Sequence, residues 1–189
     1  NGNFSFTFSQ GLSTGDNYFW LTYDVTAGAV TGEFIDAKVN NLTLTSGTFI
    51  PSSSDPTGSR PIGPMTYVSS TVAQITPVVG VNTTNNHILR IEVVTKGALS
   101  PLSVTSLSVN ANGTTTTVTN KVQNGKIFYT GTSSVFSTTT QFGATVAAID
   151  ASTVAIAGSA TLSIGTNYFW LAMDVKSTAV TGDLIDGEC

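Results

Sequence analysis

Residues 165–186 read GTNYFWLAMDVKSTAVTGDLID, and this stretch decides the fold. Its first half is rich in aromatic and other apolar residues, a composition that favours a β-strand. Because side chains alternate across a strand, Phe169 and Leu171 share one face and Trp170 lies on the other. We predict that Phe169 and Leu171 belong to a buried core.

The same stretch occurs a second time near the start of the chain. Residues 15–36 read GDNYFWLTYDVTAGAVTGEFID and match the later block at a constant offset of 150 residues. Phe19 and Leu21 are therefore the counterparts of Phe169 and Leu171, and we expect them in a core as well. A period of 150 in a chain of 189 residues predicts tandem units of about 150 residues, both incomplete here.

The repeat divides the chain into three stretches. We expect residues 1–62 to be the C-terminal part of one unit and residues 66–189 to be the N-terminal and middle part of the next. Residues 63–65 are the expected linker. Two prolines and a glycine within residues 61–64 support this boundary, because they disfavour both helix and strand pairing.

Incomplete units should leave apolar side chains uncovered. Residues 1–62 lack counterparts of residues 88–94 and 126–129, so we expect Phe6 and Phe8 to lie bare. Such a fragment is expected either to belong to a longer polypeptide or to be completed by neighbouring copies in a filament.

The remaining apolar segments also alternate with period two. In residues 88–93, for example, Leu89 and Ile91 share one face and Arg90 the other. Gly, Asn, Asp and Pro separate such runs, and only residues 144–155 could form a short helix. The pattern predicts an all-β protein, an antiparallel β-sandwich of jelly-roll or immunoglobulin-like type.

Composition excludes several classes of partner. Charged residues make up 10% of the chain, against about 25% in an average soluble protein, and the net charge is −4. Only two arginines occur, so no basic surface is expected for nucleic acid. No apolar run reaches the roughly 18 residues of a membrane helix, so no membrane insertion is expected. Cys189 is the single cysteine, which rules out an internal disulfide.

The residues that carry catalysis in common enzyme motifs are missing. His87 is the sole histidine and is expected to be an exposed residue just before a strand. No G-x-S-x-G, P-loop or H-E-x-x-H motif is present. We therefore expect no enzymatic activity and no catalytic residues.

Acidic residues recur at matching positions in the two blocks, and their oxygens could hold calcium in loops at one end of the sandwich. The candidates are Asp24, Glu33, Asp36, Asp174, Asp183 and Asp186. The favoured alternative is that these acids accept backbone hydrogen bonds at strand ends and turns, because they lack the dense spacing of calcium loops. No other cofactor is expected.

Exposed aromatic faces could stack on sugars. Tyr18 and Trp20 lie on the strand face opposite Phe19, and they could form a glycan platform. A role in a core or in an interface with a neighbouring unit is the favoured alternative.

Three segments carry a family resemblance: HILRIEVVTKGALSPLSVTSLSVN (87–110), KIFYTGTSSVFSTTTQFG (126–143) and the block that ends in IDGEC at residue 189. The chain resembles the N-terminal domain associated with BNR-repeat sialidases, and the resemblance covers nearly all of it. Gly58 to Ile62 is similar to the strand with which the family's units close.

The resemblance implies a non-catalytic β-domain of large, type IX-secreted proteins at the surface of Gram-negative bacteria. Some members carry sialidase propellers, and many are repetitive adhesins. We expect a structural or adhesive repeat that forms a stalk or filament with neighbouring repeats or copies. The alternative is a carbohydrate-binding accessory domain of a sialidase-like glycosidase, with surface glycans as partners.

Overall fold

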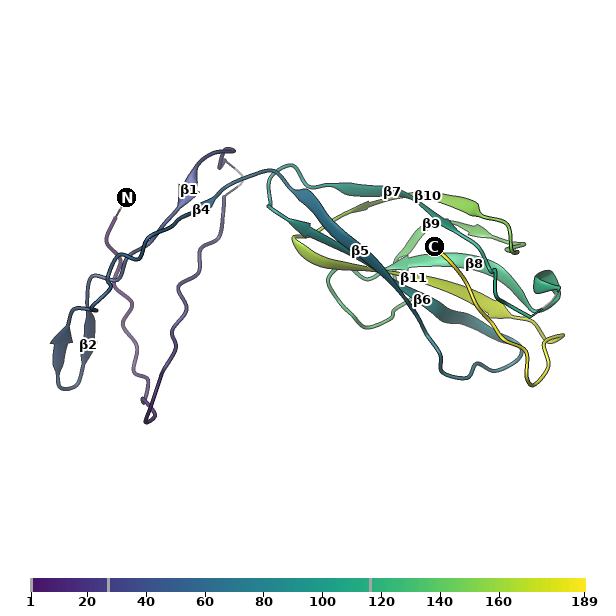
Figure 1. The fold of residues 1–189 in the computed structure, drawn as a ribbon, viewed down its shortest axis with the longest axis horizontal. Helices are drawn as coiled ribbons and strands as arrows, with labels where there is room; N and C mark the ends of the chain where they lie inside the picture. The colour runs from purple at the N-terminus through teal and green to yellow at the C-terminus, as the bar shows by residue number, and fades with distance from the viewer. Residues whose placement is uncertain (1, 27, 116) are drawn as a thin grey trace.

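The molecule is almost entirely β, and its sheets are antiparallel, as the sequence predicts. The structure is a computed structural model that describes residues 2–26, 28–115 and 117–189. Two parts lie end to end: an arm of short strands before residue 63 and a two-layered sandwich after it (Figure 1).

The larger layer of the sandwich is a five-stranded sheet built around the NYFW block. Its strand order is β5 (Thr66–Gln74), β6 (Thr83–Lys96), β11 (Gly165–Val175), β8 (Val122–Tyr129) and β9 (Gln141–Val146). In the central strand β11, Phe169 pairs with Ile91 of β6 on one side and with Tyr129 of β8 on the other.

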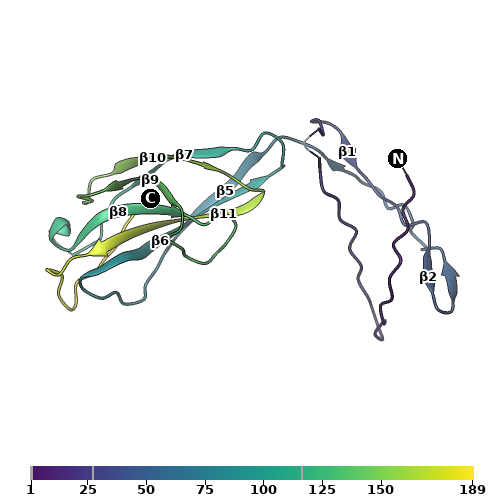
Figure 2. The ribbon, with the colours of Figure 1, turned by 180° about the vertical axis from the view of Figure 1, so that it is seen from behind.

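The smaller layer pairs β7 (Ser103–Val109) with β10 (Val154–Thr161). One hydrophobic core lies between the layers and takes residues from both sheets. Phe169 and Leu171 are fully buried there, together with Val109 and Ile156. Figure 2 shows the same two layers from behind.

No helix forms where the sequence allowed one. Residues 144–155 instead contain the end of β9, a turn and the start of β10. The one helix among the described residues is the three-residue 3-10 turn η1 (Val118–Asn120). Within the described ranges, no helix has the length and apolar character needed to cross a membrane.

The arm contains two small ladders. β1 (Phe34–Ile35) pairs with β4 (Arg60–Pro61), and β2 (Leu42–Leu44) forms a hairpin with β3 (Gly47–Phe49). In the described part of residues 2–26 no strand forms.

The prediction that Phe19 and Leu21 lie in a core is therefore wrong for this structure. They are 53% and 48% exposed. The physical reason is that a strand needs partners: the arm contains no equivalents of β6 and β8, which bury the later copy on both sides. Phe6 and Phe8 are exposed too, as expected.

Residues 63–65 form a docked joint. The N–H of Met65 donates to the carbonyl of Leu99 (2.6 Å), and the N–H of Leu99 donates to the carbonyl of Gly63 (3.4 Å). The Met65 side chain is buried in the core. Gly97 permits this approach: it has φ +78°, and a Cβ there would lie 2.3 Å from the carbonyl oxygen of Pro64.

Candidate functional site

The sandwich is closed along one side. β9 lies against β10 there, and a Cβ at Gly143 would come within 2.2 Å of the carbonyl oxygen of Ala157. The ring of Phe142 packs over Gly158, where a Cβ would lie 2.9 Å from the ring atoms. The two layers therefore meet along this side without a gap for another strand.

The opposite side is open, between the edge strands β5 and β7. Each of these strands pairs with one neighbour, so each leaves one row of backbone groups free. A groove lies between them, lined mainly by Val72 and Val93 from the large layer, Val104 and Leu107 from the small layer, and Cys189 at the chain end. Val72 is 46% exposed, so an apolar surface faces solvent here.

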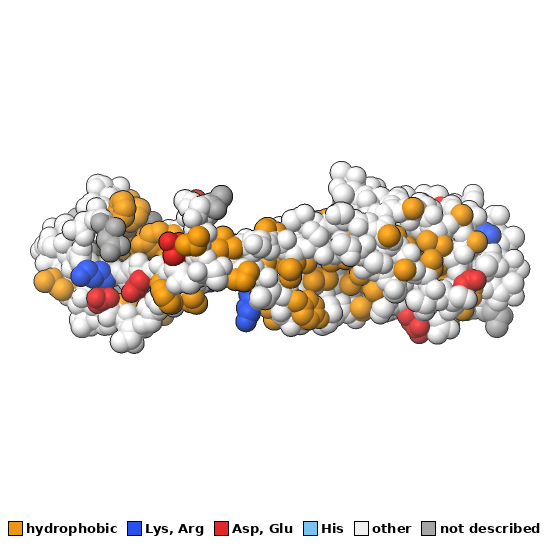
Figure 3. Space-filling view, turned by 90° about the horizontal axis from the view of Figure 1, so that it is seen from above, with side chains coloured by type: hydrophobic (Ala, Val, Ile, Leu, Met, Phe, Trp, Pro, Cys, Tyr) orange, Lys and Arg blue, Asp and Glu red, His pale blue; other side chains and the backbone are white. Residues whose placement is uncertain are grey.

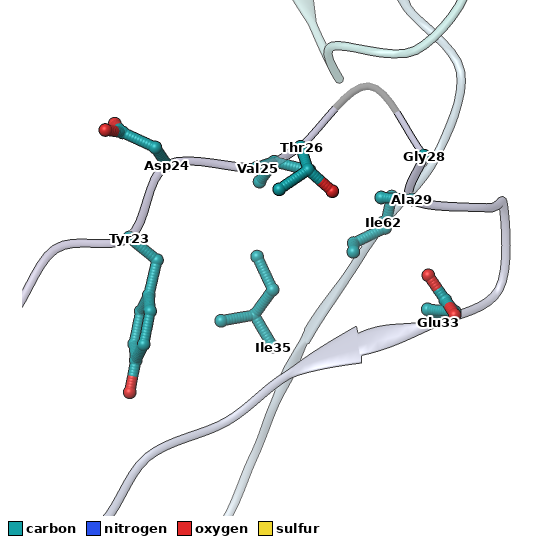
Figure 4. A pocket seen from close by; sticks show the side chains of 9 residues that line it. All are labelled: Tyr23, Asp24, Val25, Thr26, Gly28, Ala29, Glu33, Ile35 and Ile62. Atoms are coloured by element: carbon teal, nitrogen blue, oxygen red, sulfur yellow. The ribbon is translucent and has the colours of Figure 1, made fainter. Parts of the chain in front are cut away.

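Apolar side chains are also uncovered on the arm. In the space-filling view they gather along the arm and over the adjoining part of the sandwich (Figure 3). A shallow hollow in the arm is lined by Tyr23, Ile35 and Ile62, among others, and Asp24 points away from it (Figure 4). The lining has one other acid, Glu33, whose carboxylate accepts from the N–H of Val30. Because most of the lining is apolar, its chemistry favours packing rather than the binding of a charged ligand.

The two copies of the repeated block share the same local hydrogen bonds. The Asn167 side chain accepts from the N–H of Ser163 (2.9 Å) and donates to the Ser163 carbonyl (2.7 Å). Asn17 makes the same pair of bonds to Ser13, at 2.9 and 2.8 Å. The loop before the block thus folds alike in both copies, although only the later copy forms a strand.

The acidic residues in the turn after the block's first half also make the same backbone hydrogen bond in both copies. The N–H of Val180 donates to the carboxylate of Asp183 (2.7 Å), and the N–H of Val30 donates to that of Glu33 (2.9 Å). Lys121 adds an ion pair to Asp183 at 2.8 Å, which contributes to holding the pKa of Asp183 below its ordinary value. Asp183 and Glu33 therefore accept backbone hydrogen bonds in turns, which is the alternative to calcium binding that the sequence favours.

Asp174 sits at the most enclosed of the acidic positions. It accepts from the N–H of Asn85 (2.8 Å) and the side chain of Asn124 (2.8 Å), and it pairs with Lys126 (3.2 Å). Burial by itself raises the pKa of Asp174, but these donors outweigh burial and hold the pKa below its ordinary value.

The six calcium candidates do not converge. Asp186 accepts from the N–H of the next residue, as does Asp36, and Asp24 is exposed. Within the described ranges, no three acidic, histidine or cysteine side chains come together as a metal site.

The aromatic residues on the outer face of the large sheet are covered in the later copy. Trp170 is 3% exposed and donates from Nε1 to the hydroxyl of Thr130 (3.0 Å). Phe136, in the loop after β8, lies against Trp170 and Phe128. In the arm, by contrast, Trp20 is 87% exposed and Tyr18 is also uncovered. The aromatic face at Trp170 is therefore covered, whereas Tyr18 and Trp20 of the arm are bare.

His87 belongs to this aromatic cluster. It lies within β6 rather than before a strand, and its ring stacks on Phe136 (4.4 Å) and meets the edge of Trp170 (5.7 Å). The prediction of an exposed residue before the strand is therefore wrong. Burial lowers the pKa of His87 from 6.5. Among the described residues, no carboxylate or hydroxyl hydrogen bonds to its ring, so it lacks the partners of a catalytic base.

Comparison with known protein families identifies a match. A family model described as the N-terminal domain of BNR-repeat neuraminidase matches residues 66–186. These residues span all seven strands of the sandwich, and over this range the match confirms the resemblance seen in the sequence motifs. The similarity of Gly58 to Ile62 to the family's closing strand lies outside the matched residues. The comparison with curated proteins finds no match.

Proposed function

Because the chain belongs to the family of the N-terminal domain of BNR-repeat neuraminidase, we propose that it is a non-catalytic structural module of a secreted or surface protein, and that it associates with copies of itself. The observation that carries this proposal is the open side of the sandwich. An apolar groove flanked by two unpaired strand edges is a surface suited to another polypeptide.

The chemistry of the described residues supports a non-catalytic role. His87 is enclosed by aromatic rings, and Asp174 and Asp183 are engaged by lysines. Arg90 forms an ion pair with Glu92 at 2.9 Å, and Arg60 lies in the arm. The chain has only these two arginines, whereas the resemblance implies that a sialidase clamps its substrate carboxylate with three.

The family and the composition support a place outside the cell. We propose that the module forms part of a stalk or filament at a bacterial cell surface and presents adhesive parts there. A type IX-secreted adhesin is the form that agrees with the resemblance. A surface wetted by hydroxyls and amides, with few charges, suits such a setting.

Sedimentation velocity of the full chain tests self-association. We expect the weight-average sedimentation coefficient to rise with protein concentration. A chain that sediments as a monomer across the accessible range would contradict the proposed function.

A second candidate function is carbohydrate binding in a neuraminidase. The observation that favours it is the exposure of Tyr18 and Trp20. Titration with sialylated and neutral oligosaccharides, followed by tryptophan fluorescence, would detect binding, and Trp20→Ala should abolish the signal while Trp170→Phe retains it. Saturable binding by a chain that stays monomeric would establish this candidate over self-association.

A further inference from the structure

We infer that the side chains of Lys126 and Asn85 join in an amide bond, an intramolecular isopeptide cross-link, with Asp174 as the group that carries the proton. The bond ties β8 to β6, the two strands that flank β11 (Figure 1). The reaction occurs once within a folded chain and turns over no substrate, so it agrees with a non-enzymatic module. The inference is independent of the proposed self-association, because it rests on contacts within the sandwich.

Three side chains from three neighbouring strands meet at this point. The Lys126 ammonium donates to Oδ1 of Asn85 (2.8 Å) and lies 3.2 and 3.4 Å from the two carboxylate oxygens of Asp174. The backbone N–H of Asn85 donates to the same carboxylate (2.8 Å). An amine, a side-chain amide and a carboxylate are therefore in contact, and these are the three groups that the transfer of an amide requires.

The site is shielded from water. The side chains of Lys126 and Asp174 are 17% and 8% exposed, and Asn85 is half-buried. A side-chain amide is inert toward a free amine in water, but groups that are held in contact gain a large effective concentration. Partial burial also disfavours the charged form of a lysine, and the neutral amine is the form that attacks.

The strands depart from regular pairing on both sides of Asp174. The register with β6 shifts after Met173, and the register with β8 shifts after Ala172. Asn85 and Asn124, opposite these shifts, have positive φ angles of 54° and 53°. Irregularities of this kind redirect side chains, and here they bring both asparagines to one carboxylate.

The proposed step conserves atoms and charge. A proton passes from the Lys126 ammonium to the Asp174 carboxylate, and the neutral amine attacks Cγ of Asn85. The new Nζ–Cγ bond replaces the bond from Cγ to the amide nitrogen of Asn85. That nitrogen takes one proton from the attacking amine and the proton held by Asp174, and it leaves as ammonium. No oxidant, reductant or metal takes part.

The surroundings of Asp174 affect the rate of this step. Burial raises the pKa of Asp174 and favours the first proton transfer, whereas the hydrogen bonds to its carboxylate lower the pKa and oppose the transfer. Because the hydrogen bonds outweigh burial, we expect the bond to form slowly after the chain has folded.

Other lysines of the sandwich have different partners. Lys121 pairs with Asp183 (2.8 Å), and Lys176 donates to the backbone carbonyl of Thr119 (2.7 Å). Among the described residues, Lys126 is the only lysine whose ammonium donates to a side-chain amide. Lys121 therefore provides a matched control, since it is also paired with a carboxylate but has no amide to attack.

Intact-mass spectrometry tests for the bond in the purified full chain, incubated at neutral pH and then denatured. We expect the wild-type mass to lie below the sequence mass by one ammonia per chain. Lys126→Arg keeps a cation beside Asp174 but should retain its full mass, because a guanidinium stays protonated and does not attack. Lys121→Arg should lose ammonia as the wild type does.

Glycine substitutions at the two asparagines identify the group that is attacked. Asn85→Gly removes the amide, keeps the N–H that Asp174 accepts, and adopts the positive φ freely, so it should retain its full mass. Asn124→Gly is the matched control, because Asn124 also donates to Asp174 (2.8 Å) at nearly the same φ, and it should lose ammonia. Circular dichroism verifies that each variant folds.

Peptide mapping of the wild type should recover one branched peptide that joins residue 85 to residue 126. A wild-type chain that keeps its full sequence mass after prolonged incubation would overturn the inference. Loss of water in place of ammonia would overturn it too, because the bond would then lie on Asp174. Loss of ammonia that persists in Lys126→Arg would assign the change to a succinimide at Asn124–Gly125 and would also refute the cross-link. The proposed function is tested separately, by sedimentation of the wild type.

Discussion

Asp24 and Asp174 occupy the same position in the two copies of the repeated block, but their surroundings differ. Asp174 has three donors and is almost fully buried, whereas Asp24 is exposed and points away from the arm's apolar hollow. Trp20 and Trp170 differ in the same way. At the scale of single residues, the contribution of a side chain to stability depends on its burial and its hydrogen-bond partners, and identical residues in the two copies therefore contribute differently.

Replacement of Asp174 by Asn should destabilise the sandwich. The substitution leaves the Lys126 ammonium without its counter-charge in a largely buried site, so we expect a loss of about 2–4 kcal/mol in the free energy of unfolding. Asp24→Asn is the matched control and should change it by less than about 0.5 kcal/mol. Urea unfolding of the two variants measures both values, and similar losses would contradict the assignment of the ion pair.

The stability of the sandwich should fall as the pH is lowered below 6.5. Burial lowers the pKa of His87 in the folded state, so the unfolded chain binds the proton more readily. Acidification therefore stabilises the unfolded state relative to the folded state. The contribution of neutral His87 is fully present above pH 6.5 and is lost as the pH falls toward the folded pKa.

His87→Phe provides the test, because it keeps an aromatic ring against Phe136 and removes the only histidine. Urea midpoints between pH 7 and pH 5, above the usual range of carboxylate titration, should fall for the wild type and stay level for the variant. A parallel fall in both proteins would assign the pH dependence to another group.

At the scale of elements, structure held by local hydrogen bonds forms in both copies of the block, whereas structure that needs distant partners forms in one. The Asn17 and Asn167 loops, and the turns closed by Glu33 and Asp183, form the same hydrogen bonds in both copies, because their partners lie within four residues. The strand between them forms only in the later copy, where β6 and β8 flank it. Sequence pattern therefore predicts the turns and the strand's buried face, but strand formation depends on partners far along the chain.

The same dependence on distant partners explains why the sequence pattern did not predict β5, the loop that carries Phe136, or the groove. The strand β5 is nearly all exposed and has many hydroxyl residues, so it lacks the alternation that predicts a strand. The Phe136 loop that covers Trp170 has no periodic signal at all. The groove was unpredictable because it depends on which two strands remain at the edges, a property of strand order and not of any segment.

Hydrogen exchange should distinguish the two copies. Amides of β11 (Gly165–Val175) should be strongly protected, because the strand is paired on both sides. The equivalent amides of residues 15–25 should exchange close to the rate of an unfolded peptide. Mass spectrometry of peptic peptides from one sample compares them directly, and equal protection would mean that the earlier copy also finds strand partners in solution.

At the scale of the whole molecule, the arm and the sandwich should differ in resistance to protease. Brief chymotrypsin treatment of dilute protein should cut first after exposed aromatic residues of the arm, such as Trp20, Phe34 and Phe49. A fragment that retains residues 66–189 should persist, because Phe128, Phe169 and Trp170 are buried. Intact-mass measurement identifies the fragment, and early cleavage within β11 would contradict the assigned core.

The docked joint at residues 63–65 determines how the molecule carries mechanical load. Tension on the arm reaches the sandwich at Thr66, the first residue of β5, which is paired with β6 from Thr66–Lys96 to Gln74–Leu89. A pull along β5 runs across these hydrogen bonds, so the bonds share the load and resist in shear instead of opening one at a time. The clamp to Leu99 also limits bending at the joint, and a string of such modules would act as a stiff tether under traction.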